Sequence, residues 1–478
     1  MSDRCAVRLE TGSATAEIVA MNVKASATRP LRIGLISVSA IEDDPRVRRQ
    51  GDLFWERGWD VVAIGLSGAR SKPPEWLCLD IPAAAHSAAS TTAVPAPEPG
   101  DHAADTVSPV ATEPTPGRAR RLWRTLPKPL RRAAYSAVRS ALRLADVAGV
   151  YLRDEHASAS YWRIDNRFGQ LYRRAKEKKA DIWLANDWSA LPIVRKLAAE
   201  QGVPYAYDTH ELAVDEYAQR WRWRLLNRPL IAAIERTGIA EAVVTSCVSQ
   251  GIADRLHQLY RLPEKPLLIR NMPRYEAHAF RPCGETIEVL YHGVVYEGRG
   301  LETCIDSVAL WRPEFRLTIR GPAPAEYLQT LARRILSAGV GDRVVLAPPV
   351  PMIDLVKEAA RFDIGLFALP GHSQQNVHVL PNKFFEYTMA GLALCVSDLP
   401  EMTALLRQHE LGRSIPEVTP RAIADAINGF ERDEINACKL RALEAARTLN
   451  WEAEADRFFA AMEQAVAGAG KALPGMAR

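Results

Sequence analysis

The chain has 478 residues, too many for one hydrophobic core, so the sequence predicts at least two domains. Hydrophobic residues make up 47% of it and charged residues 25%, and a net charge of +4 gives no argument for a nucleic-acid partner. Seven scattered cysteines without a CxxC pair argue against a disulfide framework or zinc site and favour a reducing compartment. With no apolar run that could span a bilayer and no secretory signal at the N-terminus, we expect a cytoplasmic protein.

The first predicted elements alternate between strand and helix. Residues 1–30 are polar and irregular, so we expect a flexible tail. RIGLIS at residues 32–37 and VVAIGL at residues 61–66 are short apolar runs that predict buried strands. Between them, apolar residues recur at helical spacing, and Gly58 supplies a helix stop. This order of strand, helix and strand favours a parallel sheet.

A long insertion then interrupts the pattern. Residues 83–117 are rich in Ala, Pro, Ser and Thr and almost lack large apolar side chains, so we expect a disordered linker. Residues 118–145 carry many Arg and Lys, no acid, and apolar residues that include Trp123. Such a basic amphipathic segment favours contact with an anionic membrane surface. The alternative is a helix that packs on the domain and keeps its basic face in solvent.

Regular alternation resumes after the insertion. Strands are predicted at residues 180–187, 204–212, 242–249 and 266–273, with helices at 191–202, 223–239 and 251–262 between them. Polar residues end these strands: Asp187 the first, Asp208, His210 and Glu211 the second, and Asn271 the last. The carboxyl ends of parallel strands are where open α/β sheets bind their ligands.

A second alternating series starts at Ile287. Strands are predicted at residues 287–293, 315–322, 343–350 and 363–369, with helices at 299–311, 325–339 and 352–362. The stretch LPNKFFEYTMAGLALCVSD, residues 380–398, then predicts a short helix ended by Gly391 and one more strand. Two successive α/β units of similar size indicate two Rossmann-like domains that face each other.

Several pieces of the chain together resemble the GT-B glycosyltransferases of family four, retaining enzymes that use nucleotide-sugar donors. DPRVRRQGDLFWERGWDVVAIG is similar to the first helix and second strand of that family, and YDTHEL to its D-x-H-E strand end. YHGVVYEGRGLETCIDS resembles the start of its second domain, PNKFFEYTMAGLALCVS its donor-binding helix, and NWEAEADRFFAAMEQA its C-terminal helix. The order and spacing of these pieces, over most of residues 31–82 and 178–467, carry the resemblance.

The resemblance implies an α/β fold of the GT-B type, with two Rossmann-like domains facing a central cleft. An N-terminal acceptor-side domain is expected at residues 31–272 and a C-terminal domain that binds the nucleotide sugar at residues 287–448. A helix at residues 449–467 is expected to cross back to the first domain.

The chemistry of such donors explains the basic residues. A nucleotide-sugar donor departs as a diphosphate, so negative charge grows on phosphate oxygens, and a metal, basic side chains or helix N-termini can neutralise it. The cleft segments of the second domain contain no DxD-type acidic pair, so we expect no metal and no cofactor. Arg299, which follows Gly293 in a glycine-containing loop, and Lys383, at a helix start, suit phosphate oxygens. The resemblance implies a catalytic role for both; the alternative for each is an exposed cation.

The helix that starts near Lys383 supplies further candidates. An ionised carboxylate can accept two hydrogen bonds from a ribose diol, and in the first turn of a helix the dipole stabilises it. The resemblance implies that Glu386 binds the donor ribose, with Gly293 and Asn382 among the substrate-binding residues. Many family members carry another glutamate eight positions earlier, where this chain has His378. We expect His378, or nearby Asn376, to hydrogen-bond the transferred sugar instead.

The first domain supplies the remaining candidates. The resemblance implies that His210 touches the donor sugar as a catalytic residue without acting as a general base; the alternative is a histidine satisfied inside the fold. Glu211 is expected to contact substrate on the acceptor side or simply to start a helix. Asp44 and Arg46 lie where the first loop could contact the acceptor, and Asp187 is expected to orient His210.

The resemblance, together with these residues, implies a metal-independent hexosyltransferase of polysaccharide biosynthesis. Its partners would be a nucleotide-sugar donor, a glycan or lipid-linked acceptor and, through residues 118–145, an anionic membrane at the inner face of the plasma membrane, with no nucleic acid. Two alternatives stay open: a hydrolysing nucleotide-sugar 2-epimerase of the same fold, and a nucleotide-sugar binder without catalysis, suggested by the missing first glutamate. A dinucleotide oxidoreductase is disfavoured because no GxGxxG follows the first strand.

Overall fold

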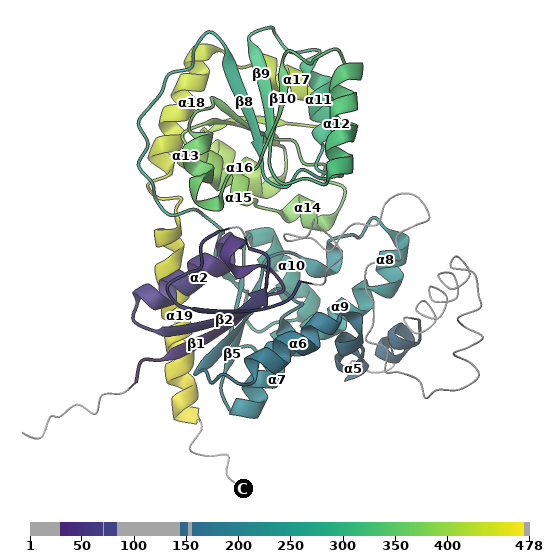
Figure 1. Cartoon of the computed structure of the whole chain (residues 1–478), viewed down its shortest axis with the longest axis vertical. Coiled ribbons are helices and arrows are strands. Elements are labelled where there is room, and N and C mark those ends of the chain that lie inside the picture. The colour runs from purple at the N-terminus through teal and green to yellow at the C-terminus, as the bar shows by residue number, and fades with distance from the viewer. Residues whose placement is uncertain (1–28, 70, 84–143, 152–154, 473–478) are drawn as a thin grey trace, which may run out of the picture.

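The computed structural model describes residues 29–69, 71–83, 144–151 and 155–472, which form two α/β lobes that lie one above the other in Figure 1. Most of the predicted tail, of the predicted linker at residues 83–117 and of the basic segment at residues 118–145 lies outside the described residues. In the part of the chain that the structure describes, no helix is both long enough and apolar enough to cross a membrane.

The first lobe is built on a seven-stranded sheet with the order β3-β2-β1-β4-β5-β6-β7. All its neighbouring strands are parallel, and β1 lies between β2 and β4, with Ile33 opposite both Val61 and Ile182. Its strands are β1 (Arg32–Ile36), β2 (Asp60–Leu66), β3 (Leu77–Ile81), β4 (Ile182–Asn186), β5 (Tyr205–Thr209), β6 (Val244–Cys247) and β7 (Leu267–Leu268). The strand order reverses direction at β1 and β4, which is where open parallel sheets leave a crevice for ligands.

Helices cover both faces of this sheet. They are η1 (Ile41–Asp43), α2 (Pro45–Glu56), α5 (Glu155–Ile164), α6 (Asn166–Ala175), α7 (Leu191–Gln201), η2 (Ala213–Asp215), α8 (Trp221–Leu226), α9 (Arg228–Ile239) and α10 (Gln250–Tyr260). The single helix predicted at residues 223–239 is two helices, because Pro229 has no backbone N–H and its ring would clash with a carbonyl of the preceding turn. The sequence also did not reveal β3, a partly exposed edge strand without a long apolar run.

The second lobe is built on a six-stranded parallel sheet with the order β10-β9-β8-β11-β12-β13. Its strands are β8 (Ile287–His292), β9 (Phe315–Arg320), β10 (Val344–Ala347), β11 (Ile364–Phe367), β12 (Ala393–Ser397) and β13 (Gly412–Ile415). Its helices are α11 (Leu301–Val308), α12 (Ala325–Ser337), η3 (Met352–Asp354), α13 (Leu355–Ala359), α14 (Gln374–His378), α15 (Asn382–Met389), α16 (Pro400–Gln408), α17 (Pro420–Asn428) and α18 (Arg432–Ala445). The α/β class with two parallel sheets, predicted from the sequence, is therefore confirmed.

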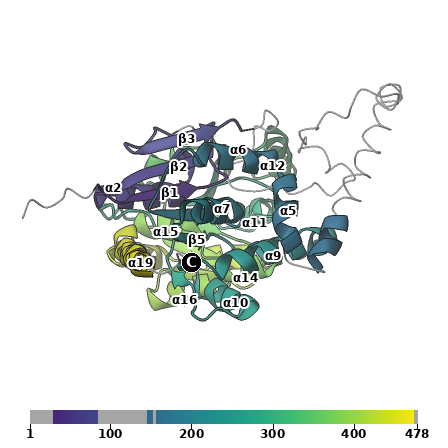
Figure 2. The same cartoon turned by 90° about the horizontal axis from the view of Figure 1, so that it is seen from below.

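The last helix, α19 (Trp451–Ala472), returns from the second lobe to the first. Phe458 is fully buried, and its ring lies 6.0 Å from that of Phe54 on α2. The backbone N–H of Trp451 donates to the carbonyl of Pro273 at 2.8 Å, beside the segment that joins the lobes. Seen end-on, α19 lies on one flank of the molecule and α5 on the other (Figure 2). The end of the chain therefore completes the core of the first lobe.

Candidate active site

The candidate residues of both lobes meet where α14 and α15 of the second lobe face the first (Figure 1). Hydrogen bonds join the lobes there; for example, the Leu212 N–H donates to Gln375 Oε1 at 2.5 Å, and the Ser249 hydroxyl donates to the His378 carbonyl at 2.7 Å. Leu212 and Ser249 follow β5 and β6, so the carboxyl ends of the first sheet lie against the second lobe.

Glu386 lies in the second turn of α15, not in the first turn as the sequence suggested, because α15 begins at Asn382. Its side chain is buried, and His292 Nε2, at the carboxyl end of β8, lies 2.8 Å from Glu386 Oε2. Burial raises the pKa of Glu386, but the close contact with His292 and the charges of Lys383 and Arg49 outweigh burial and lower the pKa. The carboxylate is therefore held in its ionised form with one oxygen already fixed.

Lys383 lies across Gly293, the residue that follows β8. A Cβ on Gly293 would lie only 2.4 Å from Lys383 Cε, and the φ of +119° at Gly293 also favours glycine. The Lys383 amino group lies 5.2 Å from the centre of the Phe367 ring and 5.8 Å from that of Tyr291. Burial and the charge of Arg299 lower the pKa of Lys383 to about 8, although Glu386 opposes the shift. A lysine is thus held beside a second cation in a largely apolar setting.

Arg299 lies in the loop between β8 and α11, and this loop is shaped by glycines. Gly298 and Gly300 have φ of +78° and +74°, and a Cβ on Gly300 would lie 2.2 Å from the Ala368 carbonyl oxygen. Arg299 is close enough to Lys383 to lower the pKa of that amine. Burial raises the pKa of Glu211 in the first lobe, and the charge of Arg299 opposes this shift. The charge of Arg299 therefore affects the pKa of a group in each lobe.

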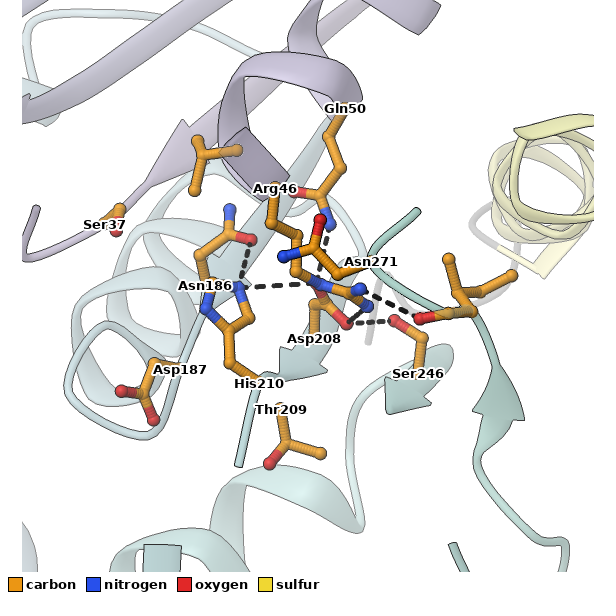
Figure 3. Close-up of polar contacts among 12 residues, drawn as sticks. Ser37, Arg46, Gln50, Asn186, Asp187, Asp208, Thr209, His210, Ser246 and Asn271 are labelled. Carbon is orange, nitrogen blue, oxygen red and sulfur yellow. Dashed lines mark hydrogen bonds and ion pairs between the residues drawn. The ribbon is translucent and has the colours of Figure 1, made fainter. Parts of the chain in front are cut away.

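A buried ion pair joins α2 to β5 in the first lobe (Figure 3). Arg46 of α2 and Asp208 of β5 are 2% and 0% exposed, and the guanidinium donates to both carboxylate oxygens. Gln50 Nε2 and the Ser246 hydroxyl each donate to Asp208 at 2.6 Å, and Arg46 also donates to the Ile269 carbonyl at 2.8 Å. Burial raises the pKa of Asp208, but Arg46 outweighs burial and holds it far below its ordinary value.

The same carboxylate positions His210, which follows β5. Nε2 of His210 lies 3.2 Å from Asn186 Oδ1 and 3.5 Å from Asp208 Oδ2, as Figure 3 shows. Burial lowers the pKa of His210, but the hydrogen bond and charge of Asp208 outweigh burial and raise it. The predicted orienting residue, Asp187, accepts a hydrogen bond from the Trp188 N–H at 2.6 Å. Asn186 and Asp208 therefore contact His210 directly, and the charge of His210 also acts on the pKa of Asp187.

The structure changes the expectation that Asp44 and Arg46 lie where the first loop could contact the acceptor. Asp44 caps α2 by accepting from the N–H groups of Arg46 and Val47, and the Ser39 hydroxyl donates to it at 2.7 Å. Arg46 points into the fold toward Asp208. Both side chains are buried, so they position α2 and do not form an acceptor surface.

His378 and Asn376, which are expected to hydrogen-bond the transferred sugar, make contacts within the protein. A Cβ on Gly251, in the first turn of α10, would lie 2.2 Å from His378 Nδ1, so the His378 ring packs against the first lobe. The Gly251 N–H donates to Glu401 Oε1 at 2.6 Å. Asn376 Nδ2 donates to the Pro370 carbonyl at 2.8 Å, and Asn382 is the first residue of α15. His378 thus lies at the contact between the lobes.

Three residues of the site were missed by the sequence analysis: Arg49, Asn186 and His292. Arg49 of α2 donates to Asn271 Oδ1 at 2.5 Å, and its charge lowers the pKa of Glu386 across the two lobes. Asn186 and His292 end the observed strands β4 and β8, one residue before the predicted ends, and a search for polar residues near strand ends could have found both. Nothing in the pattern of α2 singles out Arg49 from its arginine neighbours. In the described ranges, no group of three His, Cys, Asp or Glu side chains is arranged to hold a metal ion.

Comparison with known families gives the class of the protein. The model of Glycosyltransferase Family 4 matches residues 145–272, and that of Glycosyl transferases group 1 matches residues 286–433. Together the two models cover more than half of the chain, one in each lobe. The chain belongs to the GT-B glycosyltransferases of family four. A comparison with curated protein sequences gives no match.

Solved glycosyltransferase structures share the fold over nearly the whole chain. Sucrose-phosphate synthase from Thermosynechococcus elongatus has a TM-score of 0.62 at 16% identity, covering 92% of this chain and 100% of that one. HepE from Anabaena, solved with UDP and glucose, has a TM-score of 0.57 at 11% identity, covering 91% and 100%. WaaG, a glycosyltransferase involved in lipopolysaccharide biosynthesis, has a TM-score of 0.54 at 13% identity, covering 90% and 98%. At these identities the likeness shows the fold alone.

The buried pair predicts a large effect of Asp208→Asn on stability. The substitution leaves the Arg46 charge buried without its counterion, so we expect the free energy of unfolding to fall by about 3–5 kcal/mol. Urea unfolding followed by circular dichroism measures this loss. Asp254→Asn is the control, because Asp254 and Lys265 form an exposed pair at 2.7 Å whose loss costs at most about 1 kcal/mol. Equal effects of the two substitutions would contradict the central role of Asp208.

Proposed function

We propose that the chain is a retaining, metal-independent hexosyltransferase that moves a sugar from a nucleotide-diphosphate donor to a glycan or lipid-linked acceptor. Membership of the family supports sugar transfer and does not favour the 2-epimerase or the non-catalytic binder. The observation that carries the finer proposal is the pairing of Lys383 and Arg299. Burial and the charge of Arg299 lower the pKa of Lys383 to about 8, and Glu386 is the carboxylate whose charge opposes that shift.

Such an arrangement favours a polyanion over a single carboxylate. Each cation lowers the cost of growing negative charge on phosphate oxygens, and a partly apolar setting strengthens the attraction. A diphosphate bound by Lys383 and Arg299 would also relieve the repulsion between them. Gly293 supports the assignment, because the absence of a side chain there lets Lys383 reach across the end of β8. Asn382 would add a free N–H of the first turn of α15.

Glu386 is proposed to accept hydrogen bonds from the two ribose hydroxyls of the donor. Its lowered pKa keeps it an acceptor at neutral pH, and the contact between His292 and Oε2 fixes the plane of the carboxylate. His292 therefore acts as a positioning residue for Glu386. This assignment places the nucleoside on the second lobe and leaves the sugar at the contact with the first.

His210, Glu211 and His378 are proposed to surround the transferred sugar and the acceptor. The raised pKa of His210 favours a donor of hydrogen bonds, which suits sugar hydroxyls. The acceptor hydroxyl would attack the anomeric carbon on the face from which the diphosphate departs, and a phosphate oxygen would take its proton. The new glycosidic bond then has the configuration of the donor, so no side chain has to act as a general base.

Glu386→Ala is expected to abolish the thermal shift that a nucleotide-sugar donor gives the native protein. Bound donor stabilises the folded state by roughly 2.7 kcal/mol at one hundred times its dissociation constant, which is a shift of several degrees. The solved complexes of HepE with UDP and UDP-glucose make UDP-glucose the first donor to screen. Glu326→Ala, an exposed acid on α12, is the matched control and should keep the full shift. A full shift in Glu386→Ala would remove the ribose assignment.

Donor affinity is expected to fall as the pH rises through about 8. Lys383 is charged below its pKa and neutral above it, so binding of the diphosphate should weaken up to roughly tenfold per pH unit above 8. Isothermal titration calorimetry with a donor found by the screen, from pH 6.5 to 9.5, measures this. Lys383→Arg keeps a charge over the whole range and should flatten the profile. The same profile in both proteins would show that another group titrates.

Residues 118–145 are proposed to bring the protein to an anionic membrane at the inner face of the plasma membrane. Deleting them should reduce co-sedimentation with vesicles that contain phosphatidylglycerol, because the segment is basic and free of acids. The thermal shift given by the donor should be unchanged. Equal co-sedimentation of the native and the shortened chain would argue against the membrane role of this segment.

A further inference from the structure

Helix α8, Trp221–Leu226, combines exposed apolar and basic side chains on one turn and a half. Trp221 is 60% exposed and Leu225 is 55% exposed. They are four residues apart, so they lie on the same face of the helix. Arg222 and Arg224 are exposed beside them. Two large apolar side chains in solvent between two cations do not contribute to the core of the lobe, so their placement calls for a partner.

Basic side chains predominate on and beside α8, and the nearest acids in the chain are Glu216 and Glu235. Residues 217–234 contain four arginines and no acid. Arg228 pairs with Asp215, with an N–O distance of 3.1 Å, and the Arg222 guanidinium lies 5.4 Å from the Trp221 ring. The basic residues 118–145 are a poor occupant of this surface because they also contain no acid. The basic and apolar side chains of α8 therefore fit a partner with an anionic surface layer and an apolar layer below it.

Helix α8 lies beside the place where the two lobes meet. The Trp223 ring is 5.9 Å from the ring of Tyr217, and Tyr217 is within reach of the charge of Arg299. Burial lowers the pKa of His372 in the second lobe, and the charge of Arg220 lowers it further. Figure 1 shows α8 on the flank of the first lobe opposite α19. A surface bound by α8 would thus lie close to the candidate active site.

We propose that α8 docks the protein on an anionic bilayer, with Trp221 and Leu225 entering the headgroup region and Arg222 and Arg224 binding lipid phosphates. Tryptophan is enriched at membrane interfaces, and each basic residue near an anionic leaflet raises binding by roughly fivefold. A single short helix offers no groove or extended surface for a folded protein, whereas a fluid bilayer imposes no shape. The docked molecule would open its active site toward lipid-linked acceptors; this last point rests on the proposed function.

Vesicle co-sedimentation of the full chain tests the docking surface. Arg222→Gln with Arg224→Gln should reduce partition onto vesicles with 30% phosphatidylglycerol in phosphatidylcholine by roughly 25-fold, the product of two fivefold losses. Arg224→Gln with Leu225→Ala should also reduce it, and its matched control is Arg333→Gln with Leu336→Ala, an exposed pair on α12 of the second lobe. The control should bind like the native chain. Trp221 fluorescence, compared with Trp221→Phe, should shift to the blue on anionic vesicles.

The outcomes separate this inference from the proposed function. If both α8 variants sediment with vesicles as well as the native chain does, the docking surface is wrong. If they also lose binding to a single-stranded RNA probe, α8 binds nucleic acid instead. Because α8 lies outside the donor-binding lobe, the donor-induced thermal shift should persist in every α8 variant. A chain that binds vesicles through α8 but gives no shift with any nucleotide sugar would keep the docking surface and remove the proposed donor chemistry.

Discussion

The first lobe depends on the ion pair between Arg46 and Asp208. A charged pair at 2% and 0% exposure is stable only when its geometry is good and its remaining bonds are made, and here Gln50 and Ser246 complete the shell. The pair joins α2 to the carboxyl ends of β5 and β6. Because Asp208 also contacts His210, the same carboxylate that fixes the fold determines where the candidate catalytic histidine lies and which charge it carries.

In the second lobe, the main electrostatic feature is the presence of two basic residues, Lys383 and Arg299, in the same site. The charge of Arg299 disfavours a charged Lys383, and burial of Lys383 adds to the cost of keeping its amino group charged. Glycines make their positions possible: Gly293 leaves room for the lysine, and Gly300 lets the arginine loop pass against Ala368. An arrangement that is unfavourable by itself and favourable with a polyanion is what a donor site requires, since preorganised charge does not have to be assembled during the reaction.

Residues of each lobe act on residues of the other within the candidate active site. Arg49 of the first lobe acts on Glu386 of the second, and Arg299 of the second acts on Glu211 of the first. Backbone and side-chain hydrogen bonds from Leu212 and Ser249 hold the lobes in this relation. Helix α19 starts beside the segment that joins the lobes and packs Phe458 against Phe54 in the core of the first lobe.

The sequence by itself determined the two parallel sheets, because apolar runs ended by glycines and polar residues follow from local chemistry. It also indicated Lys383, Arg299 and His210, which stand in motifs that can be read along the chain. Only the tertiary structure showed that Arg46 and Asp44 serve the fold, that Asn186 and Asp208 orient His210, and that His292 holds Glu386. These partners are brought together by strand order and helix packing, and no local pattern records which polar residue meets another across a sheet or between lobes.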